Sequence, residues 1–361
     1  MIKLLIVDDS ALMRRQLSML FQAQGDFEIR QARDGAEAVA ENRSFQPDVV
    51  TLDINMPQMD GITALSLIMA ERPVPVIMVS SLTEKGALAT FEALNLGAVD
   101  YVAKPGGTIS LSIDTIQADL IAKVRGAVRA RPSKARTSSV SARGLGERLR
   151  EQHTQAAQAA KARVSSAGQS REGLVLMGVS TGGPRALEEV LPLLPADFPW
   201  PVLVAQHMPA SFTAPFAARL DSICALQVVE ASRPMPVTPG TIYIGKGGAD
   251  MVLAKRGTTL TVLPKPESSQ HLWHPSVELL GRSALEHVNP QSLVAVLLTG
   301  MGNDGAAAFA DIKKSGGKTV AESEDTAVVF GMPAELIERG GASLVLPIDK
   351  IAAQLKAWAL R

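Results

Sequence analysis

The sequence contains a single cysteine, Cys224, in 361 residues. One thiol excludes an internal disulfide framework and is typical of a protein kept in a reducing compartment. Basic and acidic residues balance at 36 each, which argues against nucleic acid as the main partner and gives no polybasic membrane signal. No apolar run approaches membrane-spanning length, and Asp8 and Asp9 come too early for a signal peptide. We therefore expect a cytoplasmic protein without membrane insertion.

Apolar residues make up 46% of the chain, and its length predicts two or three packed domains. From Arg129 the composition changes to arginine, lysine, serine, alanine and glutamine, with almost no large apolar residues. Such a segment buries too little surface to offset the entropy lost on ordering, so we expect a basic tether; an alanine- and glutamine-rich helix over 145–162 is the alternative. We predict a first domain over 1–128, a linker over 129–170 and a second domain over 171–361.

The first domain contains short apolar runs, each followed by polar residues and by apolar residues at helical spacing. This alternation predicts a doubly wound parallel sheet, in which functional groups gather beyond the carboxyl ends of the strands. Strands are expected over 2–7, 48–52, 74–79 and 99–103, with helices between them, for instance over 62–71 and 85–96.

Polar residues at these strand ends form one predicted site. Asp8, Asp9 and Asp53 supply three carboxylates, and Ser80 and Lys104 supply a hydroxyl and an ammonium group. Carboxylates with a phosphate oxygen suit Mg²⁺, and a carboxylate such as Asp53 can attack a phosphoryl group. The alternative is that these are ordinary solvated loop residues, but the complete set favours a phosphoacceptor site.

In the second domain, Gly178–Pro184 follows an apolar run and precedes a helical pattern. Small residues around Ser180 allow a sharp turn that exposes a nucleophilic hydroxyl. A phosphate-binding or structural loop is the alternative for this turn. Two further runs end in His207 and Asp304, so the strand-end rule brings a serine, a base and a carboxylate to one edge of a second parallel α/β sheet. This set suits acyl transfer, with His207 as the base and Asp304 as its orienting acid.

Other residues of the second domain are rivals for these roles. Asp250, Asp311 and Asp325 are rival acids, but the glycine-rich loop around Asp304 favours that residue. The chain order serine, histidine, aspartate differs from that of the α/β-hydrolases, and no zinc-binding spacing points to metal-dependent hydrolysis. The remaining histidines, His153, His271, His274 and His287, lack a strand-end signature and suit surface or structural positions.

The motifs Val-Asp-Asp-Ser, Leu-Asp-Ile-Asn-Met-Pro-Gln-Met-Asp-Gly, Met-Val-Ser-Ser and Tyr-Val-Ala-Lys-Pro resemble those of bacterial response-regulator receiver domains, which are flavodoxin-like. The resemblance covers the whole first domain. It implies phosphorylation by a sensor histidine kinase. The residues it assigns are Asp53 as phosphoacceptor, Asp8, Asp9, Asp53 and the Asn55 carbonyl as Mg²⁺ ligands, and Ser80, Lys104 and Tyr101 as the phosphoryl switch.

The motifs Gly-Val-Ser-Thr-Gly-Gly-Pro, Gln-His-Met-Pro, Leu-Thr-Gly-Met-Gly-Asn-Asp-Gly and Val-Val-Phe-Gly-Met-Pro resemble the chemotaxis receptor methylesterases of the CheB type. The resemblance implies a mainly parallel α/β catalytic domain that hydrolyses glutamate γ-methyl esters, and deamidates glutamines, on methyl-accepting chemotaxis receptors. It implies Ser180, His207 and Asp304 as the triad, with Thr181 and Met301 lining the site and the Met301 N–H in the oxyanion hole. We expect a monomer that needs no cofactor for ester hydrolysis.

The chain departs from this family at two places near the expected cleft. Residues 243–251 read Tyr-Ile-Gly-Lys-Gly-Gly-Ala-Asp-Met, where Tyr-Ile-Ala-Pro-Gly-Gly and a following His-Met are usual, and Trp273-His274 replaces His-Arg before Pro-Ser-Val. These changes put substrate preference in question more than chemistry. The alternatives are a receptor-binding adaptor without turnover and an enzyme that is mainly a glutamine amidase. Because the linker is long, it predicts weaker autoinhibition by the receiver than a short one would give.

Overall fold

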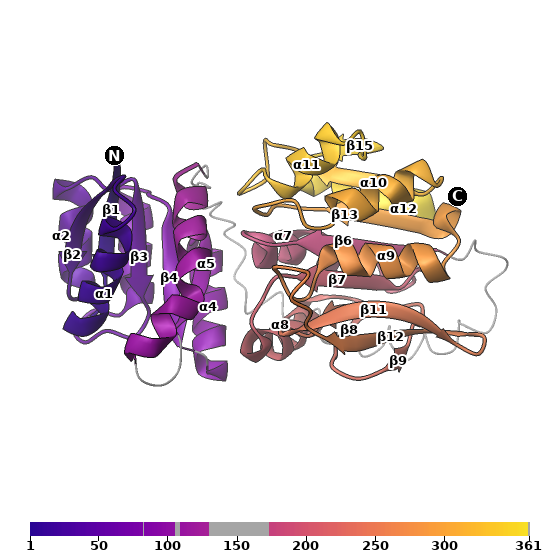
Figure 1. Ribbon diagram of the computed structural model, residues 1–361, viewed down its shortest axis with the longest axis horizontal. Helices are drawn as coiled ribbons and strands as arrows, with labels where there is room; N and C mark the ends of the chain where they lie inside the picture. The colour runs from indigo at the N-terminus through magenta and orange to yellow at the C-terminus, as the bar shows by residue number, and fades with distance from the viewer. Residues whose placement is uncertain (82, 105–108, 130–172, 360–361) are drawn as a thin grey trace. The chain divides into compact units, whose positions relative to one another are not determined.

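The computed structural model describes residues 1–81, 83–104, 109–129 and 173–359. These residues form two compact units, one on each side of residues 130–172 (Figure 1). The predicted linker lies outside the described residues except for Arg129, as does its possible helix over 145–162. The domain boundaries therefore stay predictions. Each unit is described by itself below.

The first unit is a parallel sheet of order β2-β1-β3-β4-β5 with helices along the chain between the strands. Its elements are β1 (Ile2–Val7), α1 (Ala11–Gln22), β2 (Phe27–Ala32), α2 (Gly35–Ser44), β3 (Val49–Asp53), α3 (Gly61–Glu71), β4 (Val76–Ser81), α4 (Glu84–Leu96), β5 (Asp100–Lys104) and α5 (Ile109–Arg129). This is the predicted doubly wound fold, and each predicted strand and helix lies within two residues of its observed bounds.

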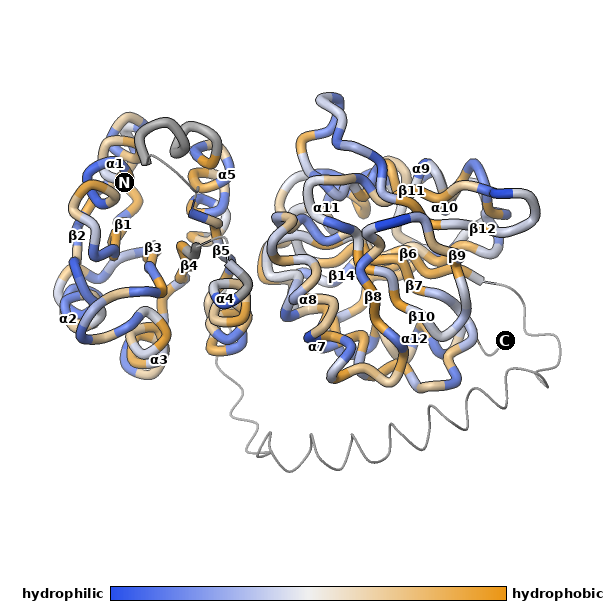
Figure 2. The backbone as a smooth tube through the Cα atoms, turned by 90° about the horizontal axis from the view of Figure 1, so that it is seen from below, coloured by the Kyte–Doolittle hydropathy of each residue, from blue (hydrophilic) through white to orange (hydrophobic). Residues whose placement is uncertain are grey.

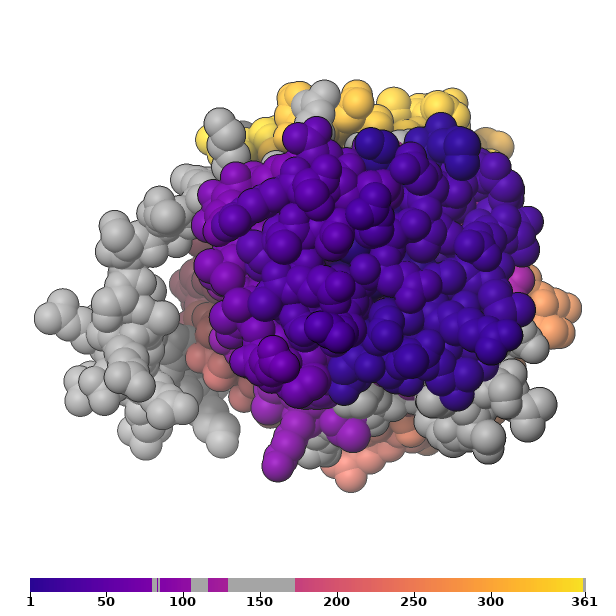
Figure 3. Space-filling view, turned by 90° about the vertical axis from the view of Figure 1, so that its left-hand side faces the viewer, coloured from indigo at the N-terminus to yellow at the C-terminus, as the bar shows by residue number. Residues whose placement is uncertain are grey.

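Strand β2 was not predicted. Its sequence Phe-Glu-Ile-Arg-Gln-Ala contains no apolar run, because it is an edge strand with three exposed or half-exposed polar residues. Figure 3 shows the surface of this unit on the side of β2 and α2.

After the carboxyl end of β1, the Ser10 side chain accepts a hydrogen bond from the Met13 N–H and caps α1. The helix therefore begins directly after Asp8 and Asp9 and fixes both at the end of the strand.

The second unit has a seven-stranded parallel sheet of order β15-β14-β13-β6-β7-β10-β8 and a separate antiparallel sheet of order β11-β12-β9. Its strands are β6 (Leu174–Val179), β7 (Val202–Gln206), β8 (Gln227–Ala231), β9 (Met235–Pro236), β10 (Thr241–Gly245), β11 (Ala249–Arg256), β12 (Thr259–Pro266), β13 (Leu293–Leu297), β14 (Lys318–Glu322) and β15 (Leu344–Leu346). Its helices are α7 (Gly183–Val190), α8 (Ala210–Ile223), α9 (Val277–His287), α10 (Ala306–Lys314), α11 (Met332–Glu338) and α12 (Ile348–Ala359), with short 3₁₀ turns at Leu191–Leu193 and Pro290–Ser292.

The central strands of this sheet are buried on both faces. Every residue of β6, β7 and β13 is buried, and Figure 2 shows β6 and β7 as apolar segments inside the unit. Such strands appear in sequence as continuous apolar runs, which is why these three were predicted. Their carboxyl ends lie side by side at one sheet edge. Within the described ranges, no helix is long and apolar enough to cross a membrane.

Candidate active site and phosphoacceptor site

Ser180 follows β6 at the centre of the seven-stranded sheet. Its N–H donates to the Thr299 carbonyl across the edge (3.0 Å), and its own carbonyl accepts from the Gly183 N–H at the start of α7 (2.8 Å). The Ser180 side chain is half-buried. These main-chain bonds hold the residue in the predicted strand-to-helix turn, with its hydroxyl at the sheet edge.

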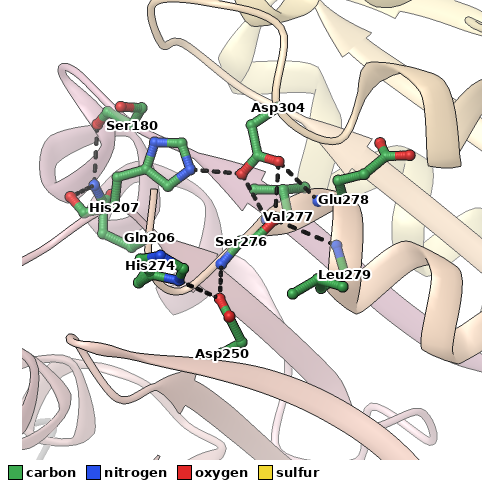
Figure 4. Close-up of polar contacts among 10 residues, drawn as sticks. All are labelled: Ser180, Gln206, His207, Asp250, His274, Ser276, Val277, Glu278, Leu279 and Asp304. Atoms are coloured by element: carbon green, nitrogen blue, oxygen red, sulfur yellow. Dashed lines mark hydrogen bonds and ion pairs between the residues drawn. The ribbon is translucent and has the colours of Figure 1, made fainter. Parts of the chain in front are cut away.

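His207 and Asp304 meet at the same edge although 97 positions separate them. His207 follows β7 and Asp304 precedes α10, and Nε2 of the histidine lies 2.8 Å from Oδ2 of the aspartate. Nδ1 of His207 is buried and has no hydrogen-bond partner among the described residues. Figure 4 shows Ser180 on the side of the imidazole opposite Asp304. The structure therefore brings the three predicted residues to one sheet edge.

The Asp304 carboxylate also accepts hydrogen bonds from the N-terminus of α9. Oδ2 accepts from the Val277 N–H (2.7 Å), and Oδ1 accepts from the Glu278 N–H (3.0 Å) and from the Ser276 hydroxyl (3.1 Å). Burial acts to raise the pKa of Asp304, but the His207 hydrogen bond and charge, with the two backbone N–H groups, together lower it. Asp304 is therefore held as a fixed negative charge beside the imidazole.

A buried amide joins the nucleophile turn to the base. Nε2 of Gln206, which is 2% exposed, donates to the carbonyls of both Ser180 (3.1 Å) and His207 (3.0 Å). The His207 N–H in turn donates to the Val179 carbonyl. The sequence analysis did not assign a role to Gln206. Its position as the last residue of β7, immediately before the histidine, was the available signal.

The loop after β13 approaches Ser180 closely. A Cβ on Gly300 would lie 2.8 Å from the Ser180 Cβ, so only glycine fits there. The N–H of the half-buried Met301 has no acceptor among the described residues. A depression of about 450 Å³ adjoins this loop and is lined by Gly302, Asn303, Phe330, Gly331, Ala334 and Glu335. A larger one of about 500 Å³, lined by residues of β8, β9 and β10, contains none of the triad.

Thr299 anchors the start of the same loop. Its hydroxyl donates to the carbonyl of Thr181 (2.8 Å), and its N–H donates to Oε2 of Glu322 (2.8 Å) at the end of β14. Thr181, the predicted lining residue, is 3% exposed. Its main-chain carbonyl is the group that binds Thr299. Burial raises the pKa of Glu322 to about 7, although the bonds from Thr299 and Thr326 oppose this. Glu322 was not identified from the sequence.

The rival acids do not contact His207. Asp250 is fully buried in β11 and accepts from Nδ1 of His274 (2.9 Å) and from the Ser276 N–H (2.8 Å). It therefore binds the loop that leads into α9, as Figure 4 shows. Asp311 pairs with Arg282 on the surface, and Asp325 is exposed.

Trp273, on the loop before α9, is the second active-site contact that the sequence analysis missed. Its rings stack on the His207 imidazole with centroids 5.4 Å apart and planes 6° from parallel. In the sequence, Trp273 stands out only as a departure from the family pattern.

The predicted phosphoacceptor site of the first unit lies at the ends of β1, β3 and β5. Carboxylate oxygens of Asp8, Asp9 and Asp53 lie within 4.8 Å of one another, and Nζ of Lys104 lies 2.7 Å from Asp53 and 2.9 Å from Asp8. Burial raises the pKa of Asp53; Lys104 opposes this and Asp8 adds to it. Although burial disfavours its charge, the two carboxylates raise the pKa of Lys104.

Three carboxylates with one ammonium group leave excess negative charge, which fits a hard divalent cation that prefers oxygen ligands. The Asn55 N–H bonds to Oδ1 of Asp53 (3.4 Å), which places this residue beside the cluster. Tyr101 is buried in β5. Ser80 lies in β4, but its side chain is outside the described residues.

Two family models match the two units of this chain. A family model described as CheB methylesterase matches residues 175–355, and one described as response regulator receiver domain matches residues 4–113. A Rhodospirillum rubrum protein named protein-glutamate methylesterase/protein-glutamine glutaminase 3 is 54% identical over 100% of this chain and 97% of its own. A Rhodopseudomonas palustris protein named protein-glutamate methylesterase/protein-glutamine glutaminase 2 is 52% identical over 99% of this chain and 98% of its own.

The crystal structure of the CheB methylesterase catalytic domain from Thermotoga maritima is 39% identical to this chain. It covers 52% of this chain and 98% of its own length, with a TM-score of 0.50. The matching regions contain Ser180, His207, Asp304 and the Asp53 cluster. This chain therefore belongs to the CheB methylesterase family, with a response-regulator receiver domain preceding its methylesterase domain.

Proposed function

We propose that this protein hydrolyses glutamate γ-methyl esters, and deamidates glutamines, on methyl-accepting chemotaxis receptors. The observation that carries the proposal is the His207–Asp304 pair at 2.8 Å beside Ser180. Support comes from the names of relatives that match over almost the whole chain, since both combine a methylesterase and a glutaminase activity. Ester and amide cleavage share one acyl-transfer chemistry, so one site serves both.

Acylation begins at Ser180. Because Asp304 faces Nε2, the neutral imidazole carries its proton there, and Nδ1 accepts the proton of the Ser180 hydroxyl. The serine oxygen bonds to the ester carbonyl carbon, and the carbonyl oxygen becomes an oxyanion. In our proposal the Met301 N–H, which has no acceptor among the described residues, donates to that oxyanion. Methanol leaves with the proton that His207 returns.

Deacylation reverses these roles. Water gives a proton to Nδ1 of His207, its oxygen attacks the glutamyl ester on Ser180, and the glutamate carboxylate is released with the serine restored. The imidazolium forms twice in the cycle, and each time Asp304 stabilises it. Lowering of the Asp304 pKa keeps this carboxylate ionised throughout. Ammonia replaces methanol as the leaving group when the substrate is a glutamine.

Phosphorylation of Asp53 by a sensor histidine kinase controls this activity in our proposal. Asp8, Asp9, Asp53 and the Asn55 carbonyl are the residues that would hold Mg²⁺, which neutralises charge on the phosphoryl group. Lys104 contacts both Asp8 and Asp53 and would move with the new charge. Ser80 and Tyr101 complete the proposed switch, and Thr181 lines the catalytic site. We propose that the enzyme acts in the cytoplasm as a monomer.

Methanol release from receptor membranes carrying glutamate methyl esters tests the function. Wild type, Ser180→Ala and Asp53→Asn are compared with and without a small-molecule phosphodonor. Wild type should release methanol faster with the phosphodonor, Ser180→Ala should release none, and Asp53→Asn should keep only the basal rate. Methanol release by Ser180→Ala at the wild-type rate would contradict the assignment. An adaptor without turnover predicts no methanol from any variant, and an enzyme that is mainly an amidase predicts ammonia instead.

A further inference from the structure

Trp273 covers one face of the catalytic imidazole. The 5.4 Å centroid separation and the 6° angle between the planes describe an offset parallel stack rather than an incidental edge contact. The His207 side chain is 8% exposed. Trp273 is itself half-buried, so its indole separates the base from solvent on that face.

The six-membered ring of the Trp273 indole packs against Gly302, on the loop that carries Met301. Gly302 has a φ of +85°, and a Cβ on it would lie 2.8 Å from Cη2 of Trp273. A residue other than glycine would be disfavoured here both by its Cβ and by the positive φ. Trp273 therefore contacts the base and the loop bearing the proposed oxyanion donor at the same time.

The Trp273 position is fixed from its C-terminal side. Asp250, fully buried, accepts from His274 Nδ1 (2.9 Å) and the Ser276 N–H (2.8 Å). The preceding residue, Leu272, is 84% exposed. The hydrogen-bonded part of this loop thus begins at His274, the residue after the tryptophan, and continues into α9.

The His207 ring needs this support because it makes one hydrogen bond among the described residues, to Asp304, and that bond holds a single edge of the ring. A ring held at one edge can tilt, which moves Nδ1 away from the Ser180 oxygen, and a tilt of this kind costs rate steeply. A stacked indole prevents tilting. Its electron-rich face also stabilises the imidazolium formed when His207 takes the serine proton.

We propose that Trp273 is a positioning residue that acts on the proposed hydrolysis through His207. It holds the imidazole plane against the Asp304 edge and ties the base to the oxyanion loop. The proposal rests on the function proposed above, and it gives a role to a residue at which this chain departs from the usual family pattern.

The test uses the full-length protein with phosphodonor and compares Trp273→Leu, Trp273→Phe and Leu272→Ala. Methanol release from methylated receptor membranes gives kcat and KM. A fluorophosphonate probe gives the rate at which Ser180 is labelled without receptor: the Ser180 oxygen bonds to phosphorus, fluoride leaves and His207 takes the proton. Trp273→Leu should lower kcat and the labelling rate by about tenfold or more, with KM changed by less than about twofold. Trp273→Phe, which can still stack, should recover most of the loss.

A second comparison places Trp273→Leu in a His207→Ala background. A residue that acts through His207 costs nothing further once that ring is gone, so the residual labelling rate should be unchanged. Leu272→Ala, the matched neighbour, should stay within about twofold of wild type in both assays. Far-UV circular dichroism confirms folding, and the phenylalanine variant carries the test if the leucine variant does not fold.

Three results would overturn the inference: a labelling rate unchanged by Trp273→Leu, an equal loss in the two backgrounds, or a loss confined to KM. The proposed function fails separately. If wild type labels at Ser180 but releases no methanol, the substrate assignment is wrong while the role of Trp273 is still measured by labelling.

Discussion

Glu322 is a single buried carboxylate behind the active-site loop, with hydrogen bonds to both of its oxygens from Thr299 and Thr326. Burial raises its pKa from 4.5 to about 7. In the unfolded chain the group loses its proton near pH 4.5, whereas the folded chain keeps it until about pH 7. Between these values the folded state binds more protons, so rising pH lowers the stability of the second unit and the effect levels off above about pH 7.

Replacing Glu322 with glutamine should remove this dependence. We expect Glu322→Gln to match wild type near pH 4 and to gain up to about 3 kcal/mol in unfolding free energy at pH 8. Urea unfolding followed by tryptophan fluorescence measures it. Glu324→Gln, an exposed neighbour, serves as the control. A wild-type stability that stays constant or rises between pH 5 and 7, relative to Glu322→Gln, would contradict the account.

Gln206 is the second residue whose position decides local geometry, because one amide nitrogen bridges the carbonyls of Ser180 and His207. In Gln206→Leu both carbonyls lose this donor in a buried site. We expect a loss of about 1–3 kcal/mol in stability and a fall in kcat larger than the rise in KM. Fluorophosphonate labelling of Ser180 alongside urea unfolding would check this. A stability loss with an unchanged labelling rate would show that the bridge is structural only.

At the scale of elements, the N-terminus of each of the helices α9 and α10 donates a hydrogen bond to a carboxylate at the start of the other helix. Asp304, just before α10, accepts from the first N–H groups of α9, while Glu278 in the first turn of α9 accepts from the Ala308 N–H of α10 (2.9 Å). Free N–H groups at a helix start carry partial positive charge and favour an anion there. Asp304, the proposed catalytic carboxylate, thus also anchors the start of α9, so its charge should affect both stability and activity.

The variant Asp304→Asn tests the effect of this charge on stability, through its pH dependence, and on kcat. Because folding lowers the Asp304 pKa below 3.8, the charge contributes stability at all pH values above the unfolded pKa, and this contribution is lost as pH falls through the folded pKa. We expect the variant to be about 1–3 kcal/mol less stable than wild type at neutral pH, with the gap closing below about pH 4. Its kcat should fall on the order of a thousandfold or more. Urea unfolding from about pH 3 to pH 8, with methanol release, measures both; a gap that widens in acid would contradict the account.

Ser276 tests the helix start alone. Its hydroxyl accepts from the Leu279 N–H as the α9 cap and donates to Asp304. Ser276→Ala should cost about 1 kcal/mol in unfolding free energy and lower kcat, while Ser276→Thr should restore both. Fluorescence-detected urea unfolding with methanol release is the measurement. Equal losses for alanine and threonine would indicate packing rather than hydrogen bonding.

The elements also explain what could be predicted from sequence. Strands β1, β3, β6, β7 and β13 are buried on both faces, so each is an apolar run whose next polar residue lies at the sheet edge. That rule predicted the meeting of Ser180, His207 and Asp304. Trp273 and Asp250 could not be predicted this way, because their contacts depend on how a loop without periodicity folds back over the edge. Strand β2 was missed because this half-exposed edge strand lacks an apolar run, and strands β8, β10, β14 and β15 and the antiparallel sheet were also not predicted.

At the scale of the whole molecule, the described residues form two units with separate cores. All three tryptophans, Trp200, Trp273 and Trp358, belong to the second unit. Tryptophan fluorescence therefore reports the unfolding of the catalytic unit alone, whereas circular dichroism reports both units.

A core substitution in the first unit should leave the second unit intact. Leu5 is fully buried in β1, and Leu5→Ala should destabilise the receiver unit by about 2–5 kcal/mol. We expect an earlier transition by circular dichroism with an unchanged fluorescence midpoint. Leu176→Ala, the matching substitution in β6, should shift the fluorescence midpoint instead. A fluorescence shift with Leu5→Ala would show that the two units unfold together.

The 97-position separation between His207 and Asp304 has a consequence for synthesis on the ribosome. The receiver unit emerges first and contains all of its own site, whereas the base gains its carboxylate only after β13 has paired with β6 in the middle of the sheet. Closing so long a loop is slow relative to local folding. A nascent or truncated chain that stops before residue 304 therefore contains the Asp53 cluster but lacks the carboxylate that contacts His207.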